Sequence, residues 1–287
     1  MLPSQLERRE IHRRMQAAAE HLRLPFRARA WQGQVGNWLG TGIGSSIDFQ
    51  DHRPYLPGDD PRYIDWQVYG RTGSYTMKLY RAEVSPFVDL VLDVSASMFV
   101  EQSKSLRTLE LFYFCIESAR RFASLRSFAV AGAVTRPLAA DEAIAGSDFL
   151  EAKSQGPLKL DLIPWRQGSL RVLISDLLFE GSPDTILTGL STNKGRGLIL
   201  APFCEPEANP DWSGNTLFID CETLRQRNQL VGSDLLARYA QTYQRHFAIW
   251  RERARKNLVN MVRVESELDF REALHREALP RGALEFC

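Results

Sequence analysis

Predominantly apolar runs alternate with amphipathic stretches along most of the chain. Residues 87–92 and 169–175 are short apolar runs, which is the pattern of strands buried on both faces. Apolar positions three and four residues apart predict a helix over residues 104–124. The same criteria predict strands at 127–134, 195–203 and 258–266, a hairpin at 216–231, and helices at 4–24, 141–153, 183–192, 234–256 and 269–278. This alternation predicts an α/β domain with a mostly parallel sheet that is covered by helices.

The first third of the chain follows a different pattern. Pro25 ends the first helical stretch, and the residues that follow are rich in glycine, which favours turns and short strands. The stretches YIDWQVY and SYTMKLYRAE, separated by GRTG, predict two strands around a tight turn. We therefore expect an N-terminal helix at residues 1–25, a β-rich segment at 26–85 and an α/β domain at 86–287. Because so short a segment buries little core alone, we expect it to pack on the α/β domain.

Polar residues follow two of the predicted buried strands. Asp93, Ser95 and Ser97 alternate directly after the first strand, and Asp176 ends the second. Open parallel sheets bind ligands beyond the carboxyl ends of their strands, so we expect these carboxylates and hydroxyls to share one site. Oxygen donors of this kind suit Mg²⁺ or Mn²⁺. The alternative is structural, with the serine-containing turn capping the next helix and Asp176 acting as a cap or turn residue.

Composition narrows the class of protein. The chain has 36 Lys and Arg residues against 35 Asp and Glu residues, so no global field draws it to nucleic acid or anionic lipid. Its four cysteines are far apart in the sequence, which suits free thiols in a reducing compartment. No run approaches the roughly 18 consecutive apolar residues of a membrane span, and the charged start lacks the apolar core of a signal peptide. We therefore expect a cytoplasmic protein with no membrane span and no nucleic-acid partner.

A cluster of charged residues lies in the β-rich segment. It consists of Asp59, Asp60, Arg62, Asp65 and Arg71. The simpler interpretation is a salt-bridged turn that docks this segment onto the α/β domain. The alternative is an exposed contact surface for a partner protein.

Two stretches of the chain resemble known families. DFQDHRPYLPGDDPRYIDWQVYGRTGSYTMKLYRAE resembles the leading motif of the domain of unknown function 58 family, a Tyr-x-Pro-Gly-Asp-Asp-x-Arg-x-Ile-Asp-Trp run followed by Arg and Lys-x-x-x-x-Glu. The tetrapeptide DCET and the helix after it are similar to that family as well, so the resemblance extends over roughly residues 30–280. The D-x-S-x-S pattern after an apolar strand, with a distant Asp, resembles the metal-ion-dependent adhesion site of von Willebrand factor A-type domains.

These resemblances imply a fold and a set of site residues. The fold is a von Willebrand A-like, doubly wound, mostly parallel sheet preceded by a small β-rich segment. Asp93, Ser95 and Ser97 match the first metal loop of such a domain, and Asp176 matches the third. Ser147, in the stretch AGSDFLEA, is a candidate for the second loop, and its alternative role is a helix cap. The implied cofactor is Mg²⁺ or Mn²⁺.

The resemblance also implies a partner, a MoxR-type AAA+ ATPase, which acts together with a client protein. Two functions follow. The first is a non-catalytic, metal-dependent interaction module that works as an adaptor in complex assembly or protein maturation. The second is a metal-assisted phosphohydrolase. We favour the adaptor, because the sequence has no G-x-S-x-G elbow around the serines and no glycine-rich phosphate loop. No catalytic residue is therefore assigned.

Overall fold

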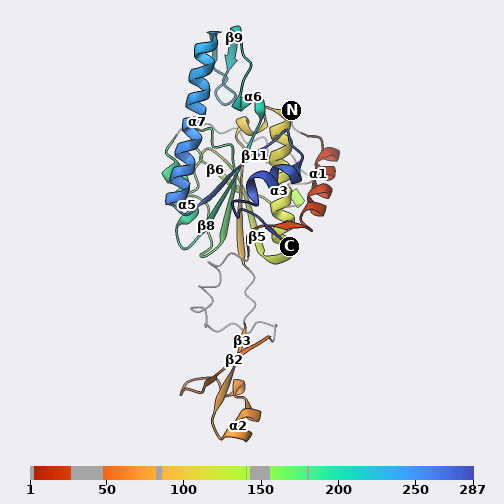
Figure 1. Cartoon of the computed structure of the whole chain (residues 1–287), viewed down its shortest axis with the longest axis vertical. Coiled ribbons are helices and arrows are strands. Elements are labelled where there is room, and N and C mark those ends of the chain that lie inside the picture. The colour runs from red at the N-terminus through yellow and green to blue at the C-terminus, as the bar shows by residue number, and fades with distance from the viewer. Residues whose placement is uncertain (1–2, 27–47, 82–85, 140, 143–155, 180) are drawn as a thin grey trace. The chain divides into compact units, whose positions relative to one another are not determined.

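The chain forms two compact units in a computed structural model. The model describes residues 3–26, 48–81, 86–139, 141–142, 156–179 and 181–287. Met1–Phe26 and Pro86–Cys287 belong to the larger unit, and Arg27–Ser85 belongs to the smaller one. Each unit has its own sheet and helices (Figure 1).

A six-stranded sheet forms the centre of the larger unit, in the order β11, β8, β7, β4, β5, β6 (Figure 1). All neighbouring strands run parallel except the edge strand β6, which is antiparallel to β5. The strands are β4 (Phe87–Asp93), β5 (Ser124–Ala131), β6 (Val134–Pro137), β7 (Leu170–Ile174), β8 (Arg196–Phe203) and β11 (Asn260–Glu265). The predicted mostly parallel α/β sheet is therefore confirmed.

Helices lie on both sides of this sheet, with α5 and α7 on one side and α1 and α3 on the other (Figure 1). Among the described residues, the larger unit contains the helices α1 (Gln5–Ala18), α3 (Gln102–Phe122), α5 (Pro183–Ser191), α6 (Glu205–Ala208), α7 (Ser233–Lys256) and α8 (Phe270–Ala273), which continues into a π turn (η6, Leu274–Ala278). Val91, Leu173 and Ile199 of the sheet share one buried cluster with Phe247 and Trp250 of α7. Burial of such large apolar side chains is the main force that holds the layers together.

The first helix is shorter than the sequence predicts. It ends at Ala18, and the next residues form a short strand, β1 (Leu22–Arg23), instead of continuing the helix to residue 24. β1 pairs with β12 (Glu285–Phe286) at the other end of the chain, and Leu22 and Leu24 are buried. Tertiary pairing thus overrides the helical composition of this stretch.

Two other predicted elements differ from the structure or lie outside it. The strand predicted at residues 127–134 is two antiparallel strands, because β5 ends at Ala131 and Gly132 turns the chain into β6 with a positive φ of 53°. Most of the helix predicted at 141–153 lies outside the described residues. The predicted hairpin is confirmed as β9 (Gly214–Ile219) and β10 (Gln226–Val231).

The smaller unit contains a two-stranded antiparallel sheet, β2 (Asp48–Pro54) and β3 (Thr76–Arg81). Between them lie a 3₁₀ turn (η3, Pro61–Tyr63) and a helix, α2 (Trp66–Thr72). The strand predicted for YIDWQVY is therefore wrong. Asp65 accepts hydrogen bonds from the N–H groups of Gln67 and Val68, and Gly73 ends the helix with a φ of 69°. An N-cap and a left-handed glycine together favour a short helix over a strand.

Asp59 and Asp60, two of the predicted charged residues, are ion-paired in the turn after β2, whereas the Arg71 guanidinium donates to the backbone carbonyl of Gln67. Arg53 makes two hydrogen bonds of 2.7 Å to Asp59, and Arg62 pairs with Asp60 at 2.7 Å. Asp65 contacts His52 at 2.9 Å, and the hydrogen bond from that imidazole is the main cause that lowers the pKa of Asp65 to about 2. Whether this unit docks onto the larger one stays a prediction.

Asp65→Ala is expected to melt α2. The substitution removes the acceptor for two orphan N–H groups, and the amides of α2 should exchange with solvent roughly 5–30-fold faster. Arg62→Ala, which removes the exposed pair with Asp60 but no cap, is the matched control and should leave α2 protected. Hydrogen exchange followed by mass spectrometry makes the comparison. Equal protection of α2 in both variants would contradict the capping role of Asp65.

Candidate functional site at the ends of strands β4 and β7

Strands β4 and β7 bring Asp93 and Asp176 to the same edge of the sheet. The two strands are parallel neighbours, with Leu92 opposite Ile174. Asp93 is the last residue of β4, and Asp176 lies two residues beyond the end of β7. The expectation that the two carboxylates follow neighbouring strands is confirmed.

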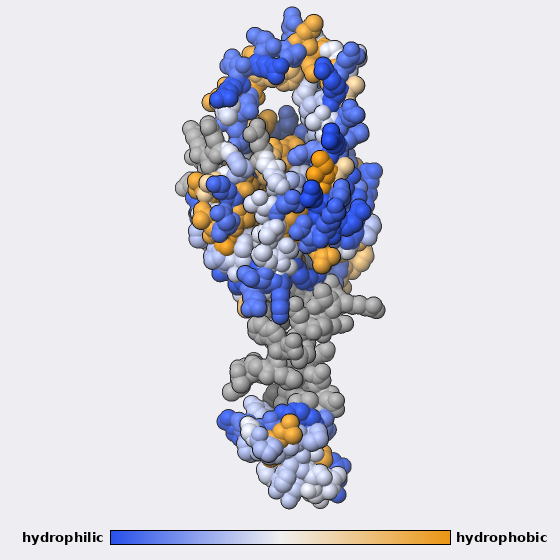
Figure 2. Space-filling model, turned by 90° about the vertical axis from the view of Figure 1, so that its left-hand side faces the viewer, coloured by the Kyte–Doolittle hydropathy of each residue, from blue (hydrophilic) through white to orange (hydrophobic). Residues whose placement is uncertain are grey.

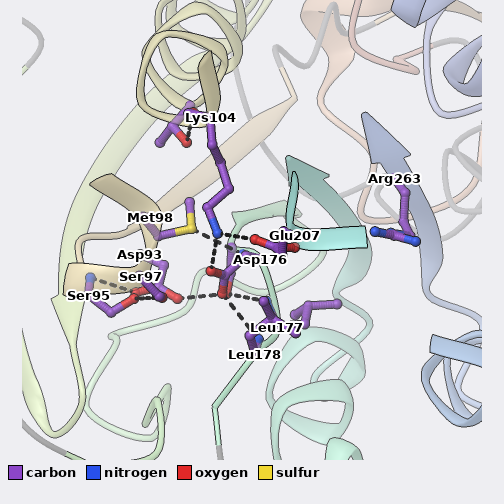
Figure 3. Close-up of polar contacts among 12 residues, drawn as sticks. Asp93, Ser95, Ser97, Met98, Lys104, Asp176, Leu177, Leu178, Glu207 and Arg263 are labelled. Carbon is purple, nitrogen blue, oxygen red and sulfur yellow. Dashed lines mark hydrogen bonds and ion pairs between the residues drawn. The ribbon is translucent and has the colours of Figure 1, made fainter. Parts of the chain in front are cut away.

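The Asp93 carboxylate shapes the loop that follows β4. Asp93 is only 1% exposed. Its Oδ1 accepts a hydrogen bond of 2.9 Å from the backbone N–H of Ser95 (Figure 3). Its Oδ2 accepts one of 2.6 Å from the hydroxyl of Ser175. A carboxylate that accepts from the N–H two residues later forms an Asx turn, which bends the chain away from the strand.

The two serines lie just beyond this turn, at a 3₁₀ turn named η4 (Ala96–Phe99). Their hydroxyl oxygens are 3.2 Å apart, and both side chains are half-buried. The alternative that the serines cap α3 is wrong, because the N-cap of α3 is Glu101. Ser95 and Ser97 therefore present two adjacent oxygen donors beside the Asp93 turn.

Asp176 is also buried, with 2% of the residue exposed. Its Oδ1 accepts a hydrogen bond of 3.1 Å from the N–H of Leu178, so Asp176 does serve as a turn residue. Its own N–H contacts the sulfur of Met98 in η4 at 3.1 Å. The loops after β4 and β7 are thus packed against each other (Figure 3).

The structure adds two residues that sequence analysis missed, Lys104 and Glu207. The ammonium group of Lys104, in α3, lies 2.8 Å from Oδ2 of Asp176 and 2.5 Å from Oε2 of Glu207, in α6. Lys104 is 3% exposed, so this is a buried ion pair and not a surface contact. Figure 3 shows the Lys104 side chain reaching down between the two carboxylates.

Most of the motif before β4, and the whole loop after β4, fall within one matched family segment. Residues 51–114 match the family model of Protein of unknown function DUF58. The DUF58 match supports that family, and its range includes Asp93, both serines and Lys104. No curated protein matches the chain. In the described part of the chain, no helix combines the length and the apolar character needed to cross a bilayer.

The β9–β10 hairpin contributes one more acidic residue to the rim of the site. At its tip, Glu222 accepts hydrogen bonds from the backbone N–H groups of Ser97 and Ala96. Burial raises the pKa of Glu222 first, and the charge of Asp176 adds to the increase while these hydrogen bonds oppose it. The strands of the hairpin carry exposed apolar side chains, including Leu217 and Leu230, on a surface that is otherwise largely hydrophilic (Figure 2).

The surroundings of Asp93 disfavour its charged form, whereas those of Lys104 favour its charged form. Burial and then the charge of Asp176 raise the pKa of Asp93 to about 6, against hydrogen bonds from Ser175 and Ser95. Burial alone would lower the pKa of Lys104, but Asp176 and Glu207 outweigh it and hold that pKa above its ordinary value. The site therefore resists a second negative charge at Asp93 and retains the ammonium at Lys104.

The donor set can hold a hard divalent cation only with help from hydroxyl oxygens. Among the described residues, no three His, Cys, Asp or Glu side chains are grouped in a way that could hold a metal ion. The neighbouring oxygens of Ser95 and Ser97, with the buried carboxylates of Asp93 and Asp176, nevertheless have the chemistry that Mg²⁺ and Mn²⁺ prefer. Ser147, the fifth predicted ligand, lies outside the described residues.

Proposed function

We propose that this protein is a non-catalytic, metal-dependent protein–protein interaction module, and that its larger unit is a von Willebrand A-like domain. Mg²⁺ or Mn²⁺ would be held by Ser95 and Ser97, with Asp93 and Asp176 as acidic supports. The observation that carries the proposal is the burial of two neighbouring carboxylates, Asp93 and Asp176; burial first, and then the charge of Asp176, raises the pKa of Asp93. Buried like charges of this kind are typical of functional sites.

The donor chemistry supports binding of an acidic partner group. Serine hydroxyls are neutral ligands, so a divalent cation held by them keeps much of its positive charge. Such a cation, when bound, supplies an attachment point for a carboxylate from another protein. The charge on Asp93 and Asp176 favours the cation, and the tight loops around both residues keep the serines in position.

The hydrogen bonding of the site supports a binding role over phosphoester hydrolysis. The Ser95 and Ser97 hydroxyls contact each other, and both oxygens of Asp93 accept structural hydrogen bonds, one from the Ser95 N–H in its own loop and one from the Ser175 hydroxyl after β7. A serine nucleophile needs a base that is oriented by a third group. Here the side chain of Ser95 bonds to Asp93, a carboxylate that is already committed to the turn.

The partner class comes from the resemblance to the DUF58 family. On that ground we propose a MoxR-type AAA+ ATPase and a client protein as the partners, and the cytoplasm as the location. The four cysteines, which are all free thiols, suit that compartment.

A capture experiment tests this function. Tagged full-length protein should retain the ATPase from lysate in Mg²⁺, and lose most of it in EDTA or after Asp93→Ala. Asp211→Ala, which changes an exposed carboxylate between α6 and β9, is the matched control and should capture like the wild type. Equal capture by Asp93→Ala, by the wild type in EDTA and by the wild type in Mg²⁺ would reject the metal-dependent mechanism. Metal-dependent turnover of a phosphoester by the purified protein would instead support the alternative function, a metal-assisted phosphohydrolase.

A further inference from the structure

Lys104 places a permanent positive charge beside the proposed metal site. It projects from the third residue of α3 and meets Asp176 at 2.8 Å, at the end of β7. The ammonium and this carboxylate are 3% and 2% exposed. Water therefore screens this charge far less than it would on the surface.

We propose that the Lys104 ammonium competes with a divalent metal ion for Asp176. When the metal binds, Lys104 leaves Asp176 and pairs with Glu207 alone. This inference rests on the metal site of the proposed function. A divalent ion near Asp176 and the ammonium of Lys104 repel each other, and both are attracted to the same carboxylate. One of them must therefore give way at Asp176.

Glu207 is ready to hold the displaced ammonium. Its Oε2 already lies 2.5 Å from the Lys104 nitrogen. Its other oxygen accepts a hydrogen bond of 2.9 Å from the Tyr243 hydroxyl, and its backbone carbonyl accepts one of 2.7 Å from the Tyr239 hydroxyl. Two tyrosines of α7 thus hold Glu207 in place. Lys104 can therefore leave Asp176 without becoming an unpaired buried charge.

The network around Glu207 extends to β11. The guanidinium of Arg263 donates to the Tyr243 hydroxyl at 2.5 Å and lies over the rings of Phe203 and Phe247, at 4.0 Å and 3.9 Å from their centroids. These contacts hold Tyr243 against Glu207. The half-buried Glu207 is therefore held through Tyr243 by a residue of β11, Arg263.

The competition predicts opposite effects of two substitutions on metal affinity. Lys104→Met removes the competing charge and is expected to tighten Mn²⁺ binding at least roughly tenfold. Glu207→Gln removes the fallback charge, so Lys104 stays on Asp176 and Mn²⁺ should bind more weakly than to the wild type. A role of Lys104 in folding alone would not move the two affinities in opposite directions. Lys256→Met, on the exposed surface of α7, is the control and should match the wild type.

Mn²⁺ titration calorimetry on the full chain separates the outcomes. Wild-type binding that is as tight as, or tighter than, binding by Lys104→Met overturns the competition and leaves the metal site standing. Binding by Lys104→Met but not by the wild type supports the competition, and it contradicts the proposal that the wild-type protein works through a bound metal ion. No binding by either protein overturns the metal site, and the competition with it. If Lys104→Met does not fold, the double variant Lys104→Met, Glu207→Gln replaces it, because it removes one of the two carboxylates that lose their partner. This double variant should bind Mn²⁺ more tightly than Glu207→Gln alone.

Discussion

Replacing Asp89 by alanine is expected to lower the free energy of unfolding by about 1.5–3 kcal/mol, because it leaves two partly exposed arginines and a buried hydroxyl without their shared acceptor. Asp89 lies in β4 and is fully buried. Its carboxylate accepts hydrogen bonds from the backbone and side chain of Arg166, from Arg126 and from the hydroxyl of Ser169. This cluster joins β4 to the segment that enters β7, so it helps to set the strand pairing that brings Asp93 and Asp176 together.

Urea denaturation of the full chain measures this effect. Asp161→Ala, in an exposed part of the segment before β7, is the control and should change stability by less than about 0.5 kcal/mol. A loss below about 1 kcal/mol for Asp89→Ala would show that the arginines find other partners at little cost.

Asp93→Asn is expected to stabilise the metal-free protein at about pH 8, by about 1–3 kcal/mol. Folding raises the pKa of Asp93 from 3.8 to about 6, so the folded state favours the protonated acid. The stability that this group contributes is fully present below about pH 4 and is lost as the pH rises through about 6. Asparagine mimics the neutral acid and keeps an oxygen for the Ser95 N–H, which is why the variant gains.

The pH profile of stability distinguishes this account from a simple packing effect. The advantage of Asp93→Asn should be absent near pH 4, grow between about pH 4 and 6, and stay constant above that range. Denaturation curves in EDTA at several pH values measure it. A variant that is less stable than the wild type at pH 8 would mean that Asp93 is ionised at little cost in the folded protein. Asparagine should also lose the thermal stabilisation by Mn²⁺ that we expect for the wild type.

The sheet and the shared edge could be predicted from the sequence because they depend on local pattern. Buried runs ending in Asp93 and Asp176 gave two strands of one parallel sheet, and the structure pairs them directly. Residues 63–69 could not be assigned in this way, because the Gly-containing turn that suggested two flanking strands instead ends a helix that is capped at Asp65 and closed by Gly73.

Lys104 carried a signal that pattern analysis could have used. It lies four positions before Thr108 and eight before Phe112, both fully buried, and so falls on the inner face of α3. A lysine on such a face needs an acidic partner. Nothing in the sequence names that partner, since Glu207 comes from a short helix 103 residues away and reaches Lys104 only through the fold.

Calorimetric titration of Mn²⁺ into the full chain, with wild type beside Asp93→Ala, tests the central claim most directly. The site at the ends of β4 and β7 predicts saturable binding and a higher melting temperature for the wild type, and neither for the variant. A wild-type protein that gives no binding heat and no thermal shift with millimolar Mn²⁺ or Mg²⁺ would contradict the claim.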